Sequence, residues 1–244
     1  DGRWWLVDPD GRLFWSHGAD CVHGHNGVTP VTDRTHWFRG LPAPETPLAR
    51  FYGKGNWAPH NYYEGREYQT FDFSAANLWR KYGPDYDAVF AARTHQRLRS
   101  WGMNTIGNWS RREIYLMRRT PYVCTIHSGG RKIEGSEGYW GKFADVFDAG
   151  FAEALRKSLD AEKGRSAGDA WCLGYFVDNE LSWGDDVSLA VAALCSPPEQ
   201  PTKAAFLADL QAKYTAIEKL NLAWGTKHAS WEALRQHREA PDRT

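Results

Sequence analysis

Short apolar segments alternate with amphipathic segments along most of this chain. Three segments are predicted as short or buried strands: 103–107, 122–126 and 171–177. Residues 16–22 predict a further strand that runs into a loop. Apolar residues that recur every three or four positions predict helices over 85–101, 111–118, about 147–163 and 202–220, with a short helix after residue 230. Because buried strands that alternate with helices are typical of parallel sheets, the pattern predicts an α/β fold.

Two segments near the N-terminus depart from this alternation. Residues 4–15 predict a β-hairpin, because Asp8-Pro9-Asp10-Gly11 supplies the proline and glycine of a tight turn between two apolar runs. Residues 23–72 form a long insertion that is rich in glycine, proline and aromatic residues and poor in periodicity. Its many Trp and Tyr side chains argue against disorder, and long irregular segments of this kind are typically functional.

The predicted strands of the parallel sheet end in polar or aromatic residues: Asp20, Asn108-Trp109, His127 and Asn179-Glu180. In a (β/α)8 barrel, active-site groups gather at the carboxyl ends of the strands. A complete barrel needs about 250 residues, and the chain has 244. The pattern nevertheless contains about four βα units rather than eight. Either the pattern misses several strands or only the first half of a barrel is present. We predict the second, a TIM-barrel fold with only the N-terminal half present, as one partial domain over residues 1–244.

Composition excludes several classes of protein. Thirty Lys and Arg residues balance thirty Asp and Glu residues, which argues against nucleic-acid binding through a basic surface. No run of about eighteen apolar residues predicts a membrane span. The four cysteines lack the CxxC spacing of zinc sites.

Aromatic residues make up 14% of the chain, and many adjoin Gly, Asn, Asp or His. Such pairs suit sugar rings, which have apolar faces and polar rims.

Asn179-Glu180 is the strongest candidate for catalysis. The apolar segment 172–177 delivers this carboxyl group at its end. An apolar environment disfavours the charged form of a carboxyl group, and a carboxylic acid that stays protonated near neutral pH can protonate a leaving oxygen. Asn179 would then hydrogen-bond a sugar hydroxyl or orient the acid. The alternative is an exposed glutamate in a loop.

Three stretches resemble one branch of the clan A glycoside hydrolases. Phe176–Gly184, with the sequence FVDNELSWG, resembles the Asn-Glu motif on strand four of that clan, and Trp101–Ser110 resembles its strand two. Residues 203–234, which contain LNLAWGT and SWEAL, resemble the helices that follow strand four. Together these stretches are most similar to the β-agarases of glycoside hydrolase family 50, with the family 42 β-galactosidases as more distant relatives.

The resemblance implies an activity and a mechanism. The activity is cleavage of β-galactosidic linkages in a galactose-containing polysaccharide such as agarose, with Glu180 as general acid/base and Asn179 as its neighbour. The mechanism is a retaining one, which needs a second carboxylate as nucleophile at about 5–5.5 Å from the acid. In the clan that carboxylate ends strand seven, and no segment after Glu180 matches it. We therefore expect the chain to be truncated after strand four and to be inactive alone.

Six further residues are candidates for substrate binding: Asp20, Trp57, Asn108, Trp109, His127 and Trp183. The tryptophans would stack on sugar rings and the polar residues would bind sugar hydroxyls, with core packing, turn formation and structural hydrogen bonds as the alternatives. His17, His23 and His25 are close in sequence, but their spacing fits no strong metal template, so we predict no metal. We also expect no redox cofactor.

Two other functions stay open on the sequence. One is a non-catalytic carbohydrate-binding protein on the same scaffold, which would lack a second carboxylate facing Glu180. The other is a family 42-like β-galactosidase that acts on small galactosides. In each case the expected partner is an oligosaccharide or polysaccharide rather than a nucleic acid or a membrane. The resemblance also favours a secreted or periplasmic bacterial protein.

Overall fold

The structure, a computed structural model, describes residues 2–241. The chain divides into two compact units. The first unit runs to Thr125 and also includes Glu162–Phe176, and the second unit comprises Ile126–Ala161 and the residues from Val177 onward. Helices and parallel strands both occur, which confirms the predicted mixed α/β class. None of the described helices combines the length and the apolar character needed to cross a membrane.

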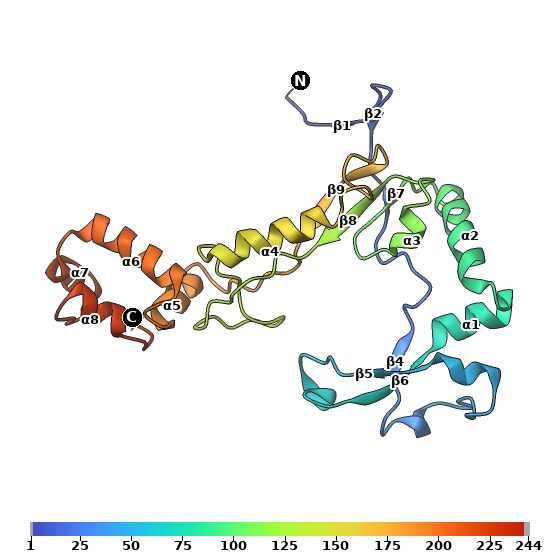
Figure 1. Ribbon diagram of the computed structural model, residues 1–244, viewed down its shortest axis with the longest axis horizontal. Helices are drawn as coiled ribbons and strands as arrows, with labels where there is room; N and C mark the ends of the chain where they lie inside the picture. Colours follow the sequence, from blue (N-terminus) through green and yellow to red (C-terminus); the bar gives the residue numbers. More distant parts are fainter. Residues whose placement is uncertain (1, 242–244) are drawn as a thin grey trace. The chain divides into compact units, whose positions relative to one another are not determined.

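A four-stranded sheet organises the first unit (Figure 1). Its strands are β3 (Gly18–Ala19), β7 (Thr105–Ile106), β8 (Tyr122–Ile126) and β9 (Cys172–Val177). Their order in the sheet is their order in the chain, and the pairs β3–β7 and β7–β8 are parallel. The first two strands are shorter than predicted, whereas β8 and β9 follow the predicted segments closely.

The core of the first unit contains side chains from this sheet and from the helices beside it. Ile106 on β7 and Tyr122 on β8 are both 0% exposed. Leu98 and Ile114, which lie in the helical segments between the strands, are 2% exposed and belong to the same cluster. The alternation of strands and helices therefore produces a shared core, as it does in parallel α/β proteins.

Two of the helices that lie between strands of this sheet along the chain contribute to its core. The first is α2 (Tyr86–Ser100), which follows the predicted segment and ends before Gly102 takes a φ of +74°. The second is α3 (Arg112–Tyr115), which is shorter than the predicted segment. It ends early because Arg118 takes a φ of +54°, a value that no α-helix contains.

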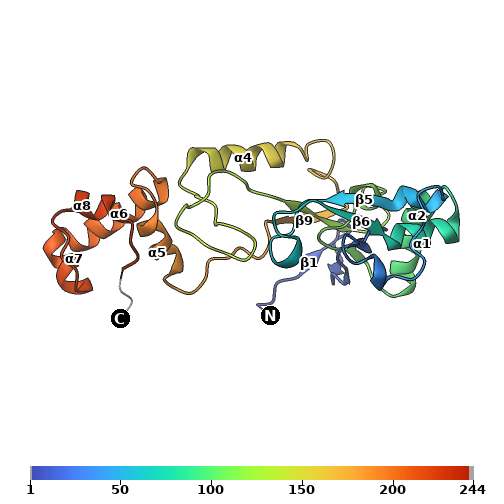
Figure 2. The same cartoon turned by 90° about the horizontal axis from the view of Figure 1, so that it is seen from below.

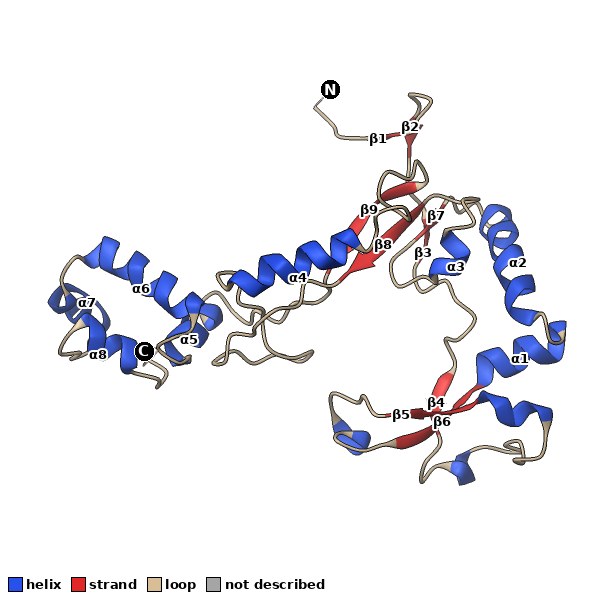
Figure 3. Ribbon diagram, viewed as in Figure 1, coloured by secondary structure: helices blue, strands red, loops and turns tan. Residues whose placement is uncertain are grey.

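The predicted insertion holds a second, antiparallel sheet (Figure 3). Its strands are β4 (Val28–Pro30), β6 (Tyr68–Asp72) and β5 (Tyr52–Gly55), in that order, and short 3-10 turns lie at Thr35–Trp37, Pro47–Phe51 and Asn61–Tyr63. Buried Phe51 and Phe71 pack with α1 (Phe73–Tyr82) in a core cluster of their own. The expected lack of regular structure is therefore wrong, because these strands are too short to show a period in the sequence.

The N-terminal part of the described chain forms a hairpin of β1 (Leu6–Val7) and β2 (Leu13–Phe14). Oδ1 of Asp8 accepts hydrogen bonds from the backbone N–H groups of Asp10 and Arg12 at 3.0 and 2.8 Å. Gly11 takes a φ of +81°, which suits glycine because it has no Cβ. The turn residues therefore close the hairpin through local hydrogen bonds.

Helices dominate the second unit. Those described are α4 (Ala149–Asp160), α5 (Ser188–Cys195), α6 (Pro201–Tyr214), α7 (Ile217–Trp224) and α8 (Trp231–Gln236). Helices α5–α8 lie together (Figure 2), and Leu194, Leu207 and Leu220 belong to the buried cluster that they share. The single helix predicted over 202–220 is wrong, because Thr215 takes a φ of +60° and separates α6 from α7. The sequence also misses α5, which is apolar throughout and shows no polar face.

A buried carboxylate joins a long loop of the second unit to the start of α6. Asp145 is 0% exposed, and it accepts hydrogen bonds from the side chains of Gln200 and Thr202, each at 2.5 Å. Burial opposes the ionisation of this group, but the hydrogen bonds from Thr202 and Gln200 outweigh burial and lower the pKa of Asp145. Asp145 is therefore a charged structural centre.

Candidate active site

The chain leaves β9 through a turn with strained backbone. Asp178 and Glu180 take φ values of +60° and +46°, a region that is costly for residues other than glycine. The Asp178 carboxylate accepts hydrogen bonds from the N–H of Ser128 at 2.9 Å and from its hydroxyl at 2.6 Å. The N–H of Asp178 donates to the carbonyl of Ile126 at 2.8 Å. These bonds compensate for the strain and hold the backbone from which Glu180 projects.

Glu180 has one specific partner in the second unit. Its Oε2 accepts a hydrogen bond of 2.6 Å from the indole Nε1 of Trp140. An indole N–H only donates, so it orients one carboxylate oxygen and leaves Oε1 for chemistry. Trp140 is 50% exposed and Glu180 is also exposed. The apolar surroundings predicted for this carboxyl group are thus not supplied by the described residues.

Trp140 is a site residue that we did not predict. It lies in a loop between Gly138 and Gly141, where the sequence shows only the aromatic pair Tyr139-Trp140 between two glycines. No helical or strand period links this loop to Glu180, which is 40 positions away. Contact between them depends on the tertiary fold, and the aromatic pair was the only available signal.

A cavity of about 260 Å³ lies next to the residues that follow Glu180. Trp183 lines it, together with Ser136 and Glu137 from the preceding loop. The indole ring of Trp183 is 57% exposed and lies 6.5 Å from the ring of Phe143. The cavity thus combines an exposed aromatic face with hydroxyl and carboxylate groups, which are the contacts that a sugar ring requires.

His127 and Asn179 lie at the same turn of the second unit. Nδ1 of His127 is 3.9 Å from Oδ1 of Asp178, and the imidazole is 74% exposed. The backbone carbonyl of His127 accepts a hydrogen bond of 2.9 Å from Ser158. Asn179 is exposed, and its side chain hydrogen-bonds to none of the residues in 2–241. Both side chains are therefore open to a ligand.

Asp20 and Asn108 meet at the ends of β3 and β7 in the first unit. The N–H of Asn108 donates to Oδ1 of Asp20 at 2.9 Å, and the Asn108 carbonyl accepts from the N–H of Cys21 at 2.8 Å. Oδ1 of Asn108 accepts from the hydroxyl of Thr125. Asn108 is 2% exposed, yet its Nδ2 has no acceptor within the described part of the chain. Such an orphaned donor is rare in proteins and suits a missing polar partner.

The structure separates the tryptophans predicted for the first unit. Trp109 follows β7 with a φ of +54°, and its N–H donates to the hydroxyl of Thr125 at 3.2 Å. Its ring is 43% exposed. Trp57 is 69% exposed, and its carbonyl accepts a hydrogen bond of 2.7 Å from Tyr68. Trp57 therefore lies in the loop that follows β5, whereas Trp109 lies next to Asn108 at the end of the parallel sheet.

The three N-terminal histidines make structural hydrogen bonds. Arg111 donates to Nε2 of His25 at 3.3 Å, so Nδ1 is the side that donates to Asp72, at 2.6 Å. Nδ1 of His23 accepts from the N–H of His25 at 3.2 Å, and burial lowers the pKa of His23. His17 lies before β3. Within residues 2–241 no group of three or more ligand side chains converges on a possible metal position.

Two curated relatives align with nearly the whole chain. β-Agarase B of Vibrio sp. (strain JT0107) is 35% identical over 95% of this chain, and β-agarase A of the same strain is 32% identical over 96%. Among solved structures, the agarase AgWH50C matches 100% of this chain with a TM-score of 0.86 and 31% identity. The chain is a relative of the family 50 β-agarases. The resemblance predicted from the sequence is thereby confirmed.

Two further structures support this β-agarase relationship. PfGH50B matches 98% of the chain with a TM-score of 0.87 and 27% identity. The structure of an exo-β-agarase matches 97% with a TM-score of 0.87 and 26% identity. No family model matches the chain.

This β-agarase relative spans only part of the proteins that it resembles. It covers 27% of β-agarase B and 25% of β-agarase A. It covers 38% of the AgWH50C chain and 39% of each of the other two solved chains. The agarase activity named for those proteins is therefore a property of much longer chains.

Proposed function

We propose that this chain supplies part of the catalytic domain of a retaining glycoside hydrolase that cleaves β-galactosidic linkages in a polysaccharide such as agarose. The observation that carries the proposal is the position of Glu180 directly after β9, with Oε2 held by Trp140. The cavity lined by Trp183 supplies a place for a sugar ring beside this turn. The agarase names of the relatives support the choice of substrate.

The proposal includes the first four strands of a (β/α)8 barrel. It is supported by the sequential order of β3, β7, β8 and β9, since a barrel adds parallel strands in chain order. Strand β9 also carries apolar side chains that remain exposed, with Leu173 at 38%, Phe176 at 52% and Val177 at 51%. Further strands and helices of a closed barrel would cover such side chains. The partial domain proposed here extends over residues 1–244, of which residue 1 and residues 242–244 lie outside the described part.

In this mechanism Glu180 acts twice. Its carboxylic acid form protonates the leaving oxygen, and its carboxylate then removes a proton from the water that releases the sugar. Trp140 positions the carboxyl group by holding Oε2. Asn179 and His127 form hydrogen bonds with sugar hydroxyls in the second unit. The Asp20 carboxylate accepts a hydrogen bond from a sugar hydroxyl in the first unit. Trp183, Trp109 and Trp57 stack on sugar rings, and the free Nδ2 of Asn108 donates to a substrate oxygen. No metal or redox cofactor enters this mechanism.

We assign the nucleophile to none of the described carboxylates. A retaining enzyme places this group about 5–5.5 Å from the acid/base. After Glu180, Glu218 lies on α7 and Glu232 on α8, while Glu199 and Glu239 lie in the loops beside these helices. The proposal therefore expects this chain to bind an oligosaccharide without hydrolysing it.

Binding and hydrolysis of an agaro-oligosaccharide on the same sample of this chain test the proposal. We expect binding by calorimetry that Trp183→Ala weakens about five- to tenfold through lost ring contact. Trp37→Ala removes another exposed indole, from the insertion, and is the matched control. Binding that Trp183→Ala leaves unchanged would contradict the site. Turnover by this chain that Glu180→Gln abolishes would show that its nucleophile is present after all.

A full-length protein that contains this sequence tests the role of Glu180 itself, through the variant Glu180→Gln. The expected loss in kcat is about 10²–10⁴-fold for substrates with poor leaving groups, because these need protonation. The loss should be much smaller for an activated aryl glycoside. An unchanged kcat on agarose would remove Glu180 from the mechanism.

A non-catalytic carbohydrate-binding protein is the second candidate. The exposed tryptophans Trp57, Trp109 and Trp183 favour it, since they serve binding whether or not a nucleophile is present. The discriminating measurement is hydrolysis by a full-length protein that contains this sequence. Sugar binding without any hydrolysis would establish the binding function.

A further inference from the structure

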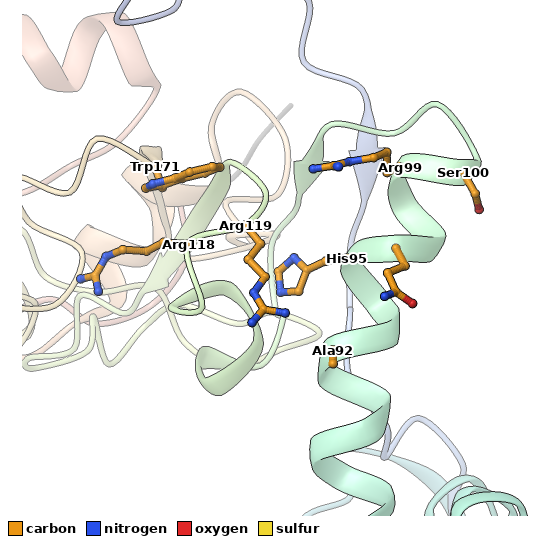
Figure 4. Close-up of a pocket in the computed structure, with 8 residues that line it drawn as sticks. Ala92, His95, Arg99, Ser100, Arg118, Arg119 and Trp171 are labelled. Atoms are coloured by element: carbon orange, nitrogen blue, oxygen red, sulfur yellow. The ribbon is translucent and has the colours of Figure 1, made fainter.

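A cavity of the first unit lies beside helix α2, at the N-terminal ends of the strands. It has a volume of about 580 Å³, and one face of α2 forms a wall through His95, Gln96 and Arg99. Arg118 and Arg119, which precede β8, and Trp171, which precedes β9, complete the lining (Figure 4). Because the strands are parallel, this cavity lies at the opposite end of the sheet from Asn108.

The arginines of this cavity differ in their partners. Nε of Arg118 donates to Oδ2 of Asp169 at 2.8 Å, and NH2 of Arg118 donates to the carbonyl of Arg165 at 3.3 Å. Its charge is thereby compensated. Arg99 and Arg119 are exposed, and neither guanidinium group forms a hydrogen bond or an ion pair with any residue in the described range. The cavity therefore presents the positive charges of Arg99 and Arg119 without a carboxylate to balance them.

His95 and Trp171 supply uncharged parts of the cavity lining. His95 is 6% exposed, its Nε2 donates to the carbonyl of Ile114 at 3.1 Å, and its Nδ1 accepts from the hydroxyl of Thr120 at 2.9 Å. Both ring nitrogens are thus occupied, and burial lowers the pKa of His95, which keeps the ring neutral. Trp171 is 37% exposed, and its backbone is held by a bond of 2.9 Å from the N–H of Tyr122. Trp171 thus offers a partly exposed aromatic face beside the arginines.

We propose that this cavity binds an anionic sugar unit, with its sulfate or carboxylate group between Arg99 and Arg119 and its ring against Trp171. A guanidinium group matches the oxygens of such anions with paired donors. An aromatic face next to these charges accepts the apolar C–H face of a pyranose ring. The volume falls within the range of about 300–1,000 Å³ that small-molecule sites occupy.

Different observations support the anion site and the sugar-ring site of this proposal. The anion site rests on the uncompensated arginines alone. The sugar ring rests on Trp171 and on the proposed function, which makes a saccharide the expected ligand of this chain. The cavity contains no carboxylate side chain that could act as an acid or a nucleophile. It therefore holds charged units of a polymer chain and does not cleave them.

Titration of the intact chain with galactose 6-sulfate, galacturonic acid and galactose tests the proposal. We expect at least one of the two anionic sugars to bind and galactose to fail, and the tighter anionic sugar identifies the charged group. Arg99→Gln and Arg119→Gln should each weaken binding about tenfold, because each removes hydrogen bonds to a charged group. Arg93→Gln, on the same helix but outside the cavity lining, is the matched control and should leave binding unchanged.

Inorganic sulfate and Trp171→Ala separate the ring from the anion. We expect Trp171→Ala to weaken binding of the anionic sugar and to leave the affinity for inorganic sulfate unchanged. Inorganic sulfate that binds as tightly as the sugar would overturn the ring part of the proposal. Absence of binding by both anionic sugars, or binding that Arg99→Gln and Arg119→Gln do not alter, would overturn the whole proposal.

A neutral agaro-oligosaccharide keeps this result separate from the proposed function. Its binding should respond to Trp183→Ala and not to Arg119→Gln. Absence of anionic-sugar binding by the unmodified chain, with neutral binding intact, would refute the arginine cavity alone. Absence of neutral binding, with anionic-sugar binding intact, would refute the carbohydrate site beside Glu180.

Discussion

Strands β8 and β9 are neighbours in one sheet and are similarly apolar in sequence, yet they differ in burial. On β8, Tyr122 and Ile126 are 0% and 3% exposed. On β9, Phe176 and Val177 are 52% and 51% exposed. An inner strand is covered by elements that this chain contains, whereas an edge strand depends on what lies next to it. An apolar run thus predicts a strand whose side chains must be buried by neighbouring elements. The tertiary structure decides whether those elements are present.

The ends of the strands show the same difference. At the end of β7, Asn108 is 2% exposed and is held by Asp20, Cys21 and Thr125. At the end of β9, exposed Glu180 has a hydrogen bond from Trp140. A buried network resists substitution more than an exposed pair does, because its polar groups have no water to replace a lost partner. Four predictions test this contrast, and the largest effect comes first.

The largest effect is expected for an aromatic residue of the inner strand. Tyr122→Ala should lower the free energy of unfolding by about 3–5 kcal/mol, the cost of a cavity left by a fully buried ring. Phe176→Ala, on the edge strand, should cost less than about 1.5 kcal/mol because half of its ring is already exposed. Urea denaturation followed by circular dichroism measures both. Equal losses would mean that β9 is covered in solution.

Loss of the buried Asp145 carboxylate in the second unit should lower the free energy of unfolding more than loss of an exposed carboxylate. Asp145→Asn replaces an acceptor of several hydrogen bonds, so we expect a loss of about 2–3 kcal/mol at neutral pH. Because the pKa of Asp145 is lowered in the folded state, its contribution is present above the ordinary value of about 4 and is lost as the pH falls through the folded pKa. Urea midpoints measured from neutral to acidic pH should therefore fall less steeply in the variant. Asp209→Asn, an exposed position on α6, is the control.

An intermediate effect is expected where β3 and β7 end. A Cβ atom at Gly107 would lie 1.9 Å from Oδ1 of Asp20, so Gly107→Ala should cost about 1–3 kcal/mol through forced displacement. The double variant with Asp20→Ala removes the clashing oxygen and should recover part of this loss in thermal unfolding. A double variant no more stable than Gly107→Ala would show that Asp20 does not pack there.

The smallest effect is expected at the exposed pair. Glu180→Ala removes the acceptor of the Trp140 indole N–H, and we expect a change of less than about 1 kcal/mol in unfolding free energy. The specific readout is the indole proton of Trp140 in an NMR spectrum, which should shift and exchange faster with solvent. Unchanged exchange would show that Trp140 does not hold Glu180 in solution.

Local chemistry allowed part of the fold to be predicted. The β8 segment, the end of α2 before Gly102 and the Ser230 cap of α8 follow from apolar runs, glycine conformation and capping. Strands of the insertion were missed because none of them is an apolar run: β4 includes Pro30, β5 includes two glycines, and β6 mixes polar and aromatic residues. The break between α6 and α7 was missed because Thr215 is not a residue that predicts a positive φ.

The candidate site was also predicted only in part: some of its residues were expected from the sequence and others were missed. Strand ends mark Asp20, Asn108 and Glu180, because each follows an apolar segment directly. Trp140 follows no predicted strand, and its separation from Glu180 along the chain matches no helical or strand period. No sequence pattern therefore linked the two residues. The arginine cavity could not be foreseen either, because Arg99, Arg119 and Trp171 come from three separate segments.

The sequence by itself determined some of the strands and helices, among them β8, β9 and α2, the side chains at the strand ends, and that the chain resembles the family 50 β-agarases. These properties depend on neighbours within a few positions or on matched motifs. Only the tertiary structure decided that Trp140 reaches Glu180, that Nδ2 of Asn108 is left without an acceptor, and that β9 stays exposed. Each of these depends on contacts between distant segments, and composition or periodicity does not encode which distant segments meet.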